Sequence, residues 1–546
     1  MAMTRASHGG GKALARPPVL SAVPRWTLDA WMSIAVVALF MCITLWWLTQ
    51  DRSIPIFDAG VRLSQAILVY EHLSSASVGT ALTTTSPYPP FAYLVGALGL
   101  GIGGLGVAPA IIAENLVFVP LLALGCYNVG RLAFGSRAGL LAVVFAFGSP
   151  LITAQFHVFM IDAPETAMVA VAVWLILATE RFSRVWVSAA AGVAVGLGML
   201  TKEPFAFFVA GVVLVTAIRG GWDAWRGFTA FSMIALAIAL PWYVNDLSKV
   251  EALARGAAQA ATGPTLDHGV APPRFSIDNL TWYFWNALNF QLYAPLFAFA
   301  MVGGLWTLVG FARRRLVSPL AWELTIGACV AWVGITETFI HDIRYGMPLL
   351  LYLAVFGSGW IVSLKRRSGR IAATGALVLI AIFNTLGATF GVGGNYQVTL
   401  PGAKPALLDA PGILTIHTNT GYLVSAPQRD GDVLGLMQAL RRNGVRQVTW
   451  INLGLKEPQP GFTPDFSRAG LISFAQIAKL EIPSEEGSEP SKLTQRDATL
   501  GHGPITPSEA PPCVRLSDGT GVWVRLGNPN APSTKNYCPF RHPAFY

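Results

Sequence analysis

Long apolar runs separated by short charged joints occupy the chain as far as about residue 393. A run of about 20 apolar residues is the length that a helix needs to cross the hydrocarbon core of a bilayer. Of the 546 residues, 53% are hydrophobic and 12% are charged, whereas a soluble domain averages about 25% charged residues. A soluble fold cannot bury that much apolar surface. The sequence therefore predicts an all-α, polytopic membrane protein.

The apolar runs predict about eleven transmembrane helices. Their approximate ranges are 29–50, 108–130, 138–157, 164–180, 186–201, 204–218, 228–245, 291–312, 319–338, 345–363 and 371–393. A shorter, glycine-rich run at 93–104 follows Pro89 and Pro90. This run is either a twelfth span or a helix that lies in the membrane interface.

The positions of Lys and Arg decide between these two counts. Cytoplasmic joints of membrane proteins are enriched in basic residues. With eleven spans and a cytoplasmic N-terminus, the inside joints carry Arg131, Arg137, Arg181, Arg184, Arg219, Arg226, Arg313 to Arg315, Lys365 to Arg367, and Arg370. A twelfth span at 93–104 would invert this pattern from there onward. The net charge of +9 is thus a topology signal, and it does not form the single basic stripe of a nucleic-acid-binding domain.

An odd number of spans places the polar tail outside the membrane. We therefore predict a cytoplasmic segment at 1–28, a transmembrane domain at 29–393 and an extracytoplasmic domain at 394–546. The two substantial outer loops are expected at 51–107 and 246–290. Because the charge bias puts the N-terminus inside, the chain is expected to be a multi-pass protein of the cell (inner) membrane.

The tail has the pattern of a small α/β domain. We expect strands at 413–417 and 447–452, a helix at 433–442, a loosely held insertion at 483–512 and a hairpin at 514–526 with Asp518 and Gly519 at its turn. Cys513 and Cys538 lie in this tail, and in an oxidising compartment they either form a disulfide or remain two unpaired thiols.

Ionisable residues gather where the predicted helices reach the outer side. They are Asp51, Asp58, Asp162, Lys202, His341, Asp342 and Arg344. Of these, Asp58, Asp162, Lys202, His341 and Arg344 are the candidate site residues. A charge near the hydrocarbon boundary is costly unless it is paired or hydrated, so a single one either extends to the interface or marks a polar cavity. Together they combine carboxylates, which take a proton, with cations, which hold an anion such as a lipid phosphate.

Five short motifs give the chain a resemblance to a known family. They are Phe57-Asp58-Ala59, Tyr88-Pro89-Pro90-Phe91, Asp162-Ala163-Pro164, the segment from Gly196 to Pro204, and the segment from Arg344 to Pro348. In this order, over roughly residues 30–365, they resemble the polyprenyl-phosphate-dependent glycosyltransferases of the GT-C fold. The similarity is to the dolichyl-phosphate-mannose protein mannosyltransferase-like and aminoarabinose transferase-like group. Relatives often have a second acid where this chain has Ala59.

The resemblance implies a GT-C fold and a transfer reaction. Such enzymes move a sugar from a polyprenyl phosphate to an acceptor hydroxyl, generally with inversion, and here on the extracytoplasmic face. It implies that Asp58 is the general base and that Asp162 orients the acceptor or shares a cation with Asp58. Lys202, Arg344 and, least firmly, His341 would hold the donor phosphate.

The partners implied are a lipid-linked sugar donor, an acceptor glycan, lipid or protein, and membrane lipids, without nucleic acid. No metal ligand is assigned and no cofactor is certain, although a divalent cation is compatible with the acids. Two rival readings stay open from the sequence. One is a transporter or flippase of lipid-linked sugars, and the other is an inactive scaffold that presents the outer domain.

Overall fold

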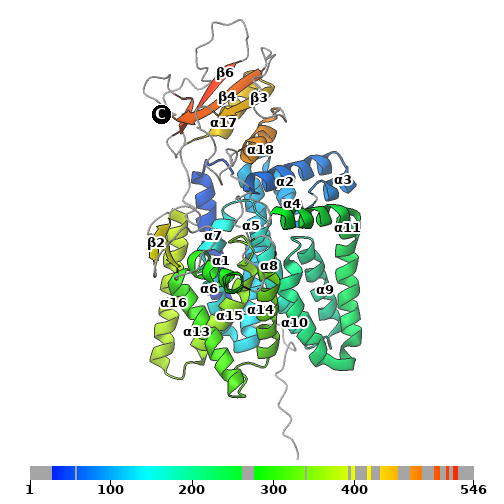
Figure 1. Ribbon diagram of the computed structural model, residues 1–546, viewed down its shortest axis with the longest axis vertical. Helices are drawn as coiled ribbons and strands as arrows, with labels where there is room; N and C mark the ends of the chain where they lie inside the picture. The colour runs from blue at the N-terminus through cyan, green and yellow to red at the C-terminus, as the bar shows by residue number, and fades with distance from the viewer. Residues whose placement is uncertain are drawn as a thin grey trace, which may run out of the picture.

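The structure is a computed structural model of the 546-residue chain. It describes residues 27–55, 58–85, 87–260, 276–338, 341–390, 395–399, 415–419, 431–452, 468–481, 497–504, 512–515 and 520–526. Figure 1 shows a bundle of helices with a smaller strand-containing part above it.

The bundle and the helices on top of it make up the chain as far as residue 390. The elements are α1 (Leu28–Gln50), α2 (Asp58–Ser74), α3 (Val78–Thr83), α4 (Phe91–Gly103), α5 (Val107–Phe134), α6 (Ser136–Phe147), α7 (Pro150–Phe156), α8 (Asp162–Ala178), α9 (Val185–Met199), α10 (Phe205–Gly220), η1 (Gly221–Ala224), α11 (Trp225–Ala260), α12 (Ile277–Asn286), η2 (Ala287–Gln291), α13 (Tyr293–Ala312), α14 (Ala321–Thr336), η3 (Met347–Leu349), α15 (Leu350–Ser363) and α16 (Arg367–Phe390). Each apolar run predicted to cross the membrane overlaps one of these helices or a consecutive pair of them.

Several helices have the length and composition of membrane spans. Among the described residues there are five, or six if the pair α6 and α7, bent by 66°, is one broken span. The five are Leu28–Gln50, Val107–Phe134, Phe205–Ala252, Tyr293–Ala312 and Arg367–Phe390. Further apolar helices are shorter, namely Phe91–Gly103, Val185–Met199, Ala321–Thr336 and Met347–Ser363. The count of eleven spans stays a prediction.

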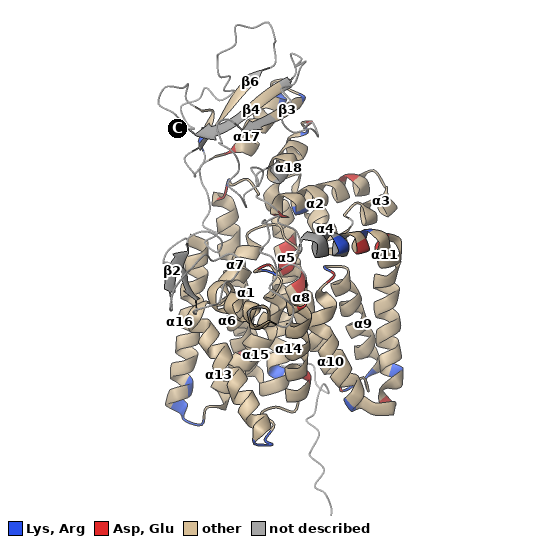
Figure 2. Cartoon of the chain, in the orientation of Figure 1, with Lys and Arg blue, Asp and Glu red and all other residues tan. Residues whose placement is uncertain are grey.

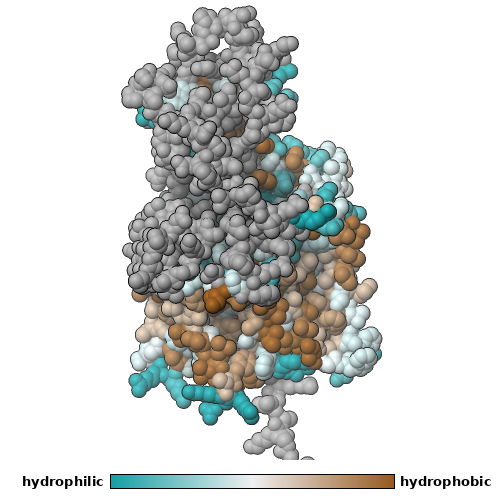
Figure 3. All heavy atoms as spheres, in the orientation of Figure 1, coloured by the Kyte–Doolittle hydropathy of each residue, from teal (hydrophilic) through white to brown (hydrophobic). Residues whose placement is uncertain are grey.

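Apolar side chains cover much of the visible lower half of the molecule in Figure 3. Leu214, Ile218 and Met233 are examples, with 55%, 68% and 62% of their surfaces exposed. Large exposed apolar areas of this kind are typical of a surface that contacts lipid or another protein. The fold is therefore compatible with a bilayer around the lower bundle.

The doubtful run at 93–104 forms helix α4. With 13 residues, it is about 20 Å long, which is shorter than the roughly 30 Å hydrocarbon core of a bilayer. The helix packs against α2 and the start of α5, and its Tyr93 and Leu100 side chains are buried there. Its length favours the interfacial reading over a twelfth span.

Helix α2 connects the bundle to the C-terminal part of the chain. The Ser473 hydroxyl of α18 (Arg468–Ala478) donates to the Gly60 carbonyl at 2.7 Å, and the Ser64 hydroxyl lies 2.8 Å from the Gln476 side-chain oxygen. Both contacts are on the first two turns of α2, and α18 lies directly above α2 in Figure 1. The C-terminal part thus covers the helix that begins at Asp58.

The described residues of the C-terminal part form two small sheets and two helices. Strands β1 (Asn395–Thr399) and β2 (Thr415–Asn419) are antiparallel. Strands β3 (Gln447–Asn452), β4 (Asp497–Pro504), β6 (Thr520–Leu526) and β5 (Val514–Arg515) form a mixed sheet in this order, beside α17 (Val433–Arg442) and α18. The β3 and β4 pair is parallel, and the other two pairs are antiparallel.

One prediction for this part is wrong. The segment 483–512 was expected to be a loosely held insertion, yet its residues Asp497–Pro504 form β4, an inner strand of the mixed sheet. Ala498 and Leu500 are fully buried, and sheet pairing on both sides outweighs the polar composition around the strand. The other elements agree more closely. Helix α17 and strand β3 have the predicted bounds, and β2 lies two residues later than the strand expected at 413–417.

Strands β5 and β6 form the expected antiparallel hairpin, although its turn at Asp518 and Gly519 lies outside the described residues. Cys513, just before β5, is disulfide-bonded. Cys538, its candidate partner if the two thiols of the tail are paired, also lies outside the described residues. Cys42, Cys126 and Cys329 are free thiols in the helices of the bundle.

Candidate active site

Arg344 links two carboxylates at the end of the bundle where α2 begins. Its Nη2 lies 2.9 Å from the Asp58 Oδ2 and 2.6 Å from the Asp342 Oδ2, and its Nε lies 2.9 Å from the Asp342 Oδ1. Asp342 therefore holds the guanidinium with two parallel bonds, the strongest geometry for an Arg–carboxylate pair. One N–H group of the same fork reaches Asp58 at the first residue of α2.

Lys202 forms a second, more buried ion pair. Its Nζ lies 2.6 Å from the Asp162 Oδ1 and 3.7 Å from the Glu165 Oε2, and it lies 4.2 Å from the centre of the Tyr345 ring. Asp162 and Glu165 are three residues apart in the first turn of α8, so they face the same side of that helix. Breaking such a buried pair by removing one partner is costly because the remaining charge is left uncompensated.

The two ion pairs act on each other. The pKa of Asp342 is influenced by Lys202 as well as by Arg344, and the pKa of Arg344 is influenced by Asp162. Burial is the largest single influence on Asp342 and opposes its ionisation, but the charge and hydrogen bonds of Arg344, together with the charge of Lys202, hold the pKa of this carboxyl below its ordinary value. The four charges thus form one electrostatic unit.

Asp58 is held in its ionised form. Burial raises its pKa, whereas Arg344 and then Arg62 lower it, and the net result is a pKa below the ordinary value of 3.8. Arg62 lies one helical turn after Asp58 on the same face of α2. Its guanidinium lies 3.6 Å from the centre of the Tyr88 ring and donates to the Tyr93 hydroxyl at 3.0 Å.

The segment from Tyr88 to Phe91 also contacts the loop between α9 and α10, which contains Lys202. The backbone N–H of Phe91, at the start of α4, donates to the Leu200 carbonyl at 2.8 Å. This bond lies two residues before Lys202. The aromatic segment before α4 therefore connects the Arg62 side of the site to the loop between α9 and α10.

Exposure differs strongly across the cluster. The Asp58 side chain is 38% exposed and the Arg344 side chain 15%, whereas those of Lys202 and Asp162 are 6% and 3% exposed. A molecule that enters the cluster from solvent therefore reaches Asp58 and Arg344 first. Lys202 lies deeper, already paired with the acids of α8.

His341 was expected to help hold a phosphate, but its ring packs between aromatic side chains. It stacks on Tyr283 with ring centres 5.4 Å apart, and it meets the edge of Trp282 at 5.0 Å. Burial lowers the pKa of the imidazole to about 4, so the ring is neutral at pH 7. This position gives no support to a role in anion binding, which remains an untested prediction.

Three acids near the cluster were given no role from the sequence. Asp342, Glu165 and Glu203 each lie within three residues of a predicted one, and that spacing was the available signal. Burial raises the pKa of Glu203, although Lys202 and Arg62 oppose this shift. Among the described residues, no three His, Cys, Asp or Glu side chains are grouped so as to hold a metal ion.

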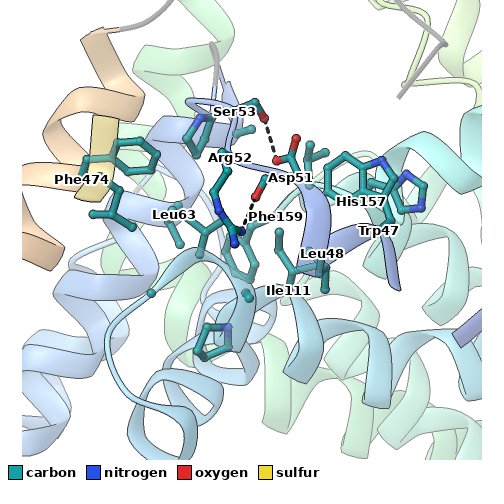
Figure 4. A pocket seen from close by; sticks show the side chains of 18 of the residues that line it. Trp47, Leu48, Asp51, Arg52, Ser53, Leu63, Ile111, His157, Phe159 and Phe474 are labelled. Atoms are coloured by element: carbon teal, nitrogen blue, oxygen red, sulfur yellow. Dashed lines mark hydrogen bonds between the residues drawn. The ribbon is translucent and has the colours of Figure 1, made fainter. Parts of the chain in front are cut away.

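A cavity of about 260 Å³ lies beside the cluster, at the C-terminal end of α1 and the N-terminal end of α5. Figure 4 shows its apolar wall, which includes Leu63 and Phe159, and the stacked rings of Trp47 and His157, whose centres are 4.4 Å apart. The carboxylate of Asp51 lies at the rim and accepts a hydrogen bond from the Ser53 hydroxyl at 2.8 Å. The ion-paired residues Asp58, Asp162, Lys202 and Arg344 are not among those that line it.

Comparisons with known proteins identify the fold. Residues 87–244 match the family model described as dolichyl-phosphate-mannose-protein mannosyltransferase. The crystal structure of ArnT from Cupriavidus metallidurans in the apo state is 13% identical, covers 90% of this chain and 98% of its own, and superposes with a TM-score of 0.55. The chain has the GT-C fold. The resemblance inferred from the five motifs is thereby confirmed.

A second structure of the same protein adds a ligand to the comparison. ArnT from Cupriavidus metallidurans bound to undecaprenyl phosphate is 14% identical, covers 91% of this chain and 98% of its own, and has a TM-score of 0.54. No curated protein sequence matches the chain significantly. The GT-C fold is thus shared over nearly the whole length, whereas few individual residues are.

Proposed function

We propose that the chain transfers a sugar from a polyprenyl phosphate to an acceptor hydroxyl on the extracytoplasmic side of the cell membrane. The reaction is a single displacement with inversion, and Asp58 is the general base. The observation that carries this proposal is the position of Arg344, which puts a cation suited to a phosphate 2.9 Å from an accessible carboxylate. A phosphate acceptor and a proton acceptor are thus adjacent.

The bond changes follow from these two groups. The acceptor oxygen attacks the anomeric carbon while the Asp58 carboxylate takes the hydroxyl proton, which contributes about 10²–10⁴ to the rate in typical enzymes. The bond between the anomeric carbon and the phosphate oxygen breaks, and its electron pair stays on the phosphate. Arg344 stabilises the charge that develops on the departing polyprenyl phosphate.

Donor binding also changes the strength of the base. A phosphate on Arg344 competes with Asp58 for the same N–H group and adds a negative charge nearby. Loss of the hydrogen bond removes an interaction that favours the ionised form of Asp58, and the added negative charge repels that form. Both effects therefore raise the pKa of Asp58. Asp58 therefore becomes a stronger base when the donor is bound, so removal of the acceptor proton is favoured when the sugar can be transferred.

In this proposal, Lys202 and Asp162 form a buried ion pair that lies deeper than the contact between Asp58 and Arg344. Lys202 can reach the donor phosphate only if its 2.6 Å pair with Asp162 opens. In the closed state it balances the acids of α8 and contributes positive charge at a distance. Asp162 remains a candidate to orient the acceptor or to share a cation with Asp58 once Lys202 turns to the donor.

The fold comparison supports a lipid-phosphate donor. A protein of the same fold binds undecaprenyl phosphate, and this chain places its paired cations at the outer ends of apolar helices, where a lipid headgroup would lie. The acceptor is a glycan, a lipid or a protein hydroxyl that approaches from the outer side. The C-terminal part, which covers α2, would border its path.

Purified protein in lipid nanodiscs should be incubated with a panel of polyprenyl-phosphate sugars, and released polyprenyl phosphate measured. Release that depends on one class of sugar and on an added acceptor is the expected result. Movement of the intact lipid-linked sugar across sealed vesicles without release of polyprenyl phosphate would instead identify a flippase.

A further inference from the structure

The cavity beside the ion pairs is large enough to hold part of a substrate. Its volume is about 260 Å³, whereas an engineered apolar cavity of about 150 Å³ already binds benzene. Its walls come from the outer ends of α1 and α5, from the first turns of α2, and from Leu434 of α17 and Phe474 of α18. The C-terminal part therefore completes a space that the bundle alone leaves open.

The cavity and the ion pairs lie on different faces of the same helix. Ala59 and Leu63 line the cavity, whereas Asp58 and Arg62 face the paired charges. Successive residues of an α-helix are rotated by about 100°, so these two pairs of positions form neighbouring stripes along α2. The segment before α8 repeats this arrangement, since Phe159 lines the cavity and the Met160 sulfur contacts Arg344 at 3.9 Å.

The charges at the rim disfavour a phosphate. Asp51 and Asp432 carry negative charge there, against one positive charge on Arg52. The Arg52 side chain folds back onto the Asp51 carbonyl at 3.0 Å, and the Asp432 carboxylate caps α17 through the Gly435 N–H at 2.8 Å. A polyprenyl phosphate headgroup would be repelled, whereas a neutral or cationic molecule with an aliphatic part fits both rim and wall.

We propose that this cavity binds the aliphatic part of an amphiphilic acceptor that is neutral or cationic, and so delivers its hydroxyl to Asp58. The inference rests on the proposed transfer reaction. In a displacement with inversion, the attacking hydroxyl and the leaving phosphate lie on opposite sides of the anomeric carbon. The phosphate belongs with Arg344 on one side of α2, and the cavity opens on the neighbouring side.

A photolabelling experiment tests the site without requiring turnover. The probe is an octyl glucoside with a diazirine in its alkyl chain, added to the full-length protein in nanodiscs, and labelled residues are mapped by mass spectrometry. We expect labels on the cavity wall, including Leu63 and Phe474, that plain octyl glucoside displaces. Ala108→Trp fills the cavity from the start of α5 and should lower labelling by about tenfold, because several methylene groups lose their apolar contact.

Two further variants control for loss of labelling through misfolding. Ala108→Leu adds less volume and should give an intermediate decrease, whereas Ala372→Trp, the same change at an exposed position of α16, should leave labelling unchanged. The assignment to the acceptor would be overturned if Ala108→Trp were labelled as strongly as the parental protein. It would also be overturned if undecaprenyl phosphate displaced the label.

The kinetic outcome separates this inference from the proposed function. In the transfer assay, Ala108→Trp should raise the KM for an alkyl-bearing acceptor and leave the KM for the donor unchanged. An equal rise in both constants would refute the acceptor site alone. If the parental protein releases polyprenyl phosphate from no sugar of the panel, the proposed transfer reaction is refuted. The cavity could then still be photolabelled, but it would not be an acceptor site.

Discussion

A single guanidinium shared between two carboxylates is the central feature of the site at the residue scale. Asp342 holds Arg344 through two bonds, whereas Asp58 holds it through one. Because Asp342 supplies the stronger grip, a phosphate can replace Asp58 on the guanidinium while Asp342 keeps the side chain in position. In the proposed reaction, Asp342 would therefore position Arg344, and Asp58 would be free to take the proton.

The effect of Arg344 on the base predicts a change in pH dependence. A general base must be deprotonated, so activity falls as the pH drops through the pKa of Asp58, which Arg344 lowers in the parental protein. Arg344→Gln removes this cation and should shift the acidic limb of kcat/KM to higher pH, besides lowering kcat by about 10²-fold through weaker stabilisation of the leaving phosphate. Arg344→Lys keeps the charge and should shift the limb less. An unchanged limb in Arg344→Gln would show that another group titrates.

The sequence predicts the members of this site better than their partners. Asp58, Asp162, Lys202 and Arg344 are conspicuous because charges are rare at the ends of apolar runs, and the structure brings them together. The contact between Asp58 and Arg344 joins positions 286 residues apart, which no local pattern reveals. The aromatic surroundings of His341 could not be foreseen either, because the rings of Trp282 and Tyr283 are distant in the sequence.

At the scale of elements, the packing of α5 against α8 sets the depth of the second ion pair. Helix α8 begins at Asp162 and is buried along most of its length. Gly125 of α5 lies directly against it, and a Cβ added there would come within 2.6 Å of the Ala170 Cβ. Such close approach through small residues is typical of helix pairs in membranes. A shift of α8 would move Asp162 and Glu165 away from Lys202.

A matched pair of glycine variants tests this packing. Gly125→Ala should destabilise the protein by about 1–3 kcal/mol, because the added methyl group overpacks the contact with α8. Gly375→Ala in α16 has no atom within 4 Å of the added Cβ and should be neutral or stabilising by up to about 1 kcal/mol. Thermal unfolding of both variants in the same detergent provides the measurement. Equal unfolding temperatures for the two would contradict the packing argument.

Elements were predictable where the hydrophobic pattern is strong. The apolar runs overlap the helices of the bundle, and the apolar stripe of α17 gives its bounds from Val433 to Arg442. Strand β4 was missed because it lies between polar, Pro- and Ser-rich stretches, and its two sheet neighbours are supplied by distant segments. Long-range pairing of this kind leaves little trace in local composition.

At the scale of the whole molecule, the basic joints of the bundle and the candidate site lie at opposite ends. Figure 2 shows Lys and Arg at the lower ends of the bundle, for example around α13 and α16, and acids at the upper ends of its central helices. The basic residues Arg313 to Arg315 and Lys365 to Arg367 lie in these lower joints. The positive-inside rule therefore predicts that the lower end is cytoplasmic and that the site and the C-terminal part lie outside.

Cysteine labelling tests this orientation. In a chain whose free thiols Cys42, Cys126 and Cys329 are replaced by alanine, we expect Arg441→Cys, exposed on α17, to react with a reagent that cannot cross the membrane. Arg366→Cys, exposed in the joint between α15 and α16, should react only after the cells are lysed. The reverse pattern would invert the topology and place the candidate site inside.

The most direct test of the whole account is the transfer rate of Asp58→Asn. The amide keeps the shape of the side chain but cannot take the acceptor proton, so release of polyprenyl phosphate should fall by about 10²–10⁴. Glu71→Gln, a matched change at an exposed position near the other end of α2, should retain the parental rate, and both variants should insert and unfold like the parent. Release by Asp58→Asn at the parental rate would contradict the assignment of Asp58 as the base and the mechanism built on it.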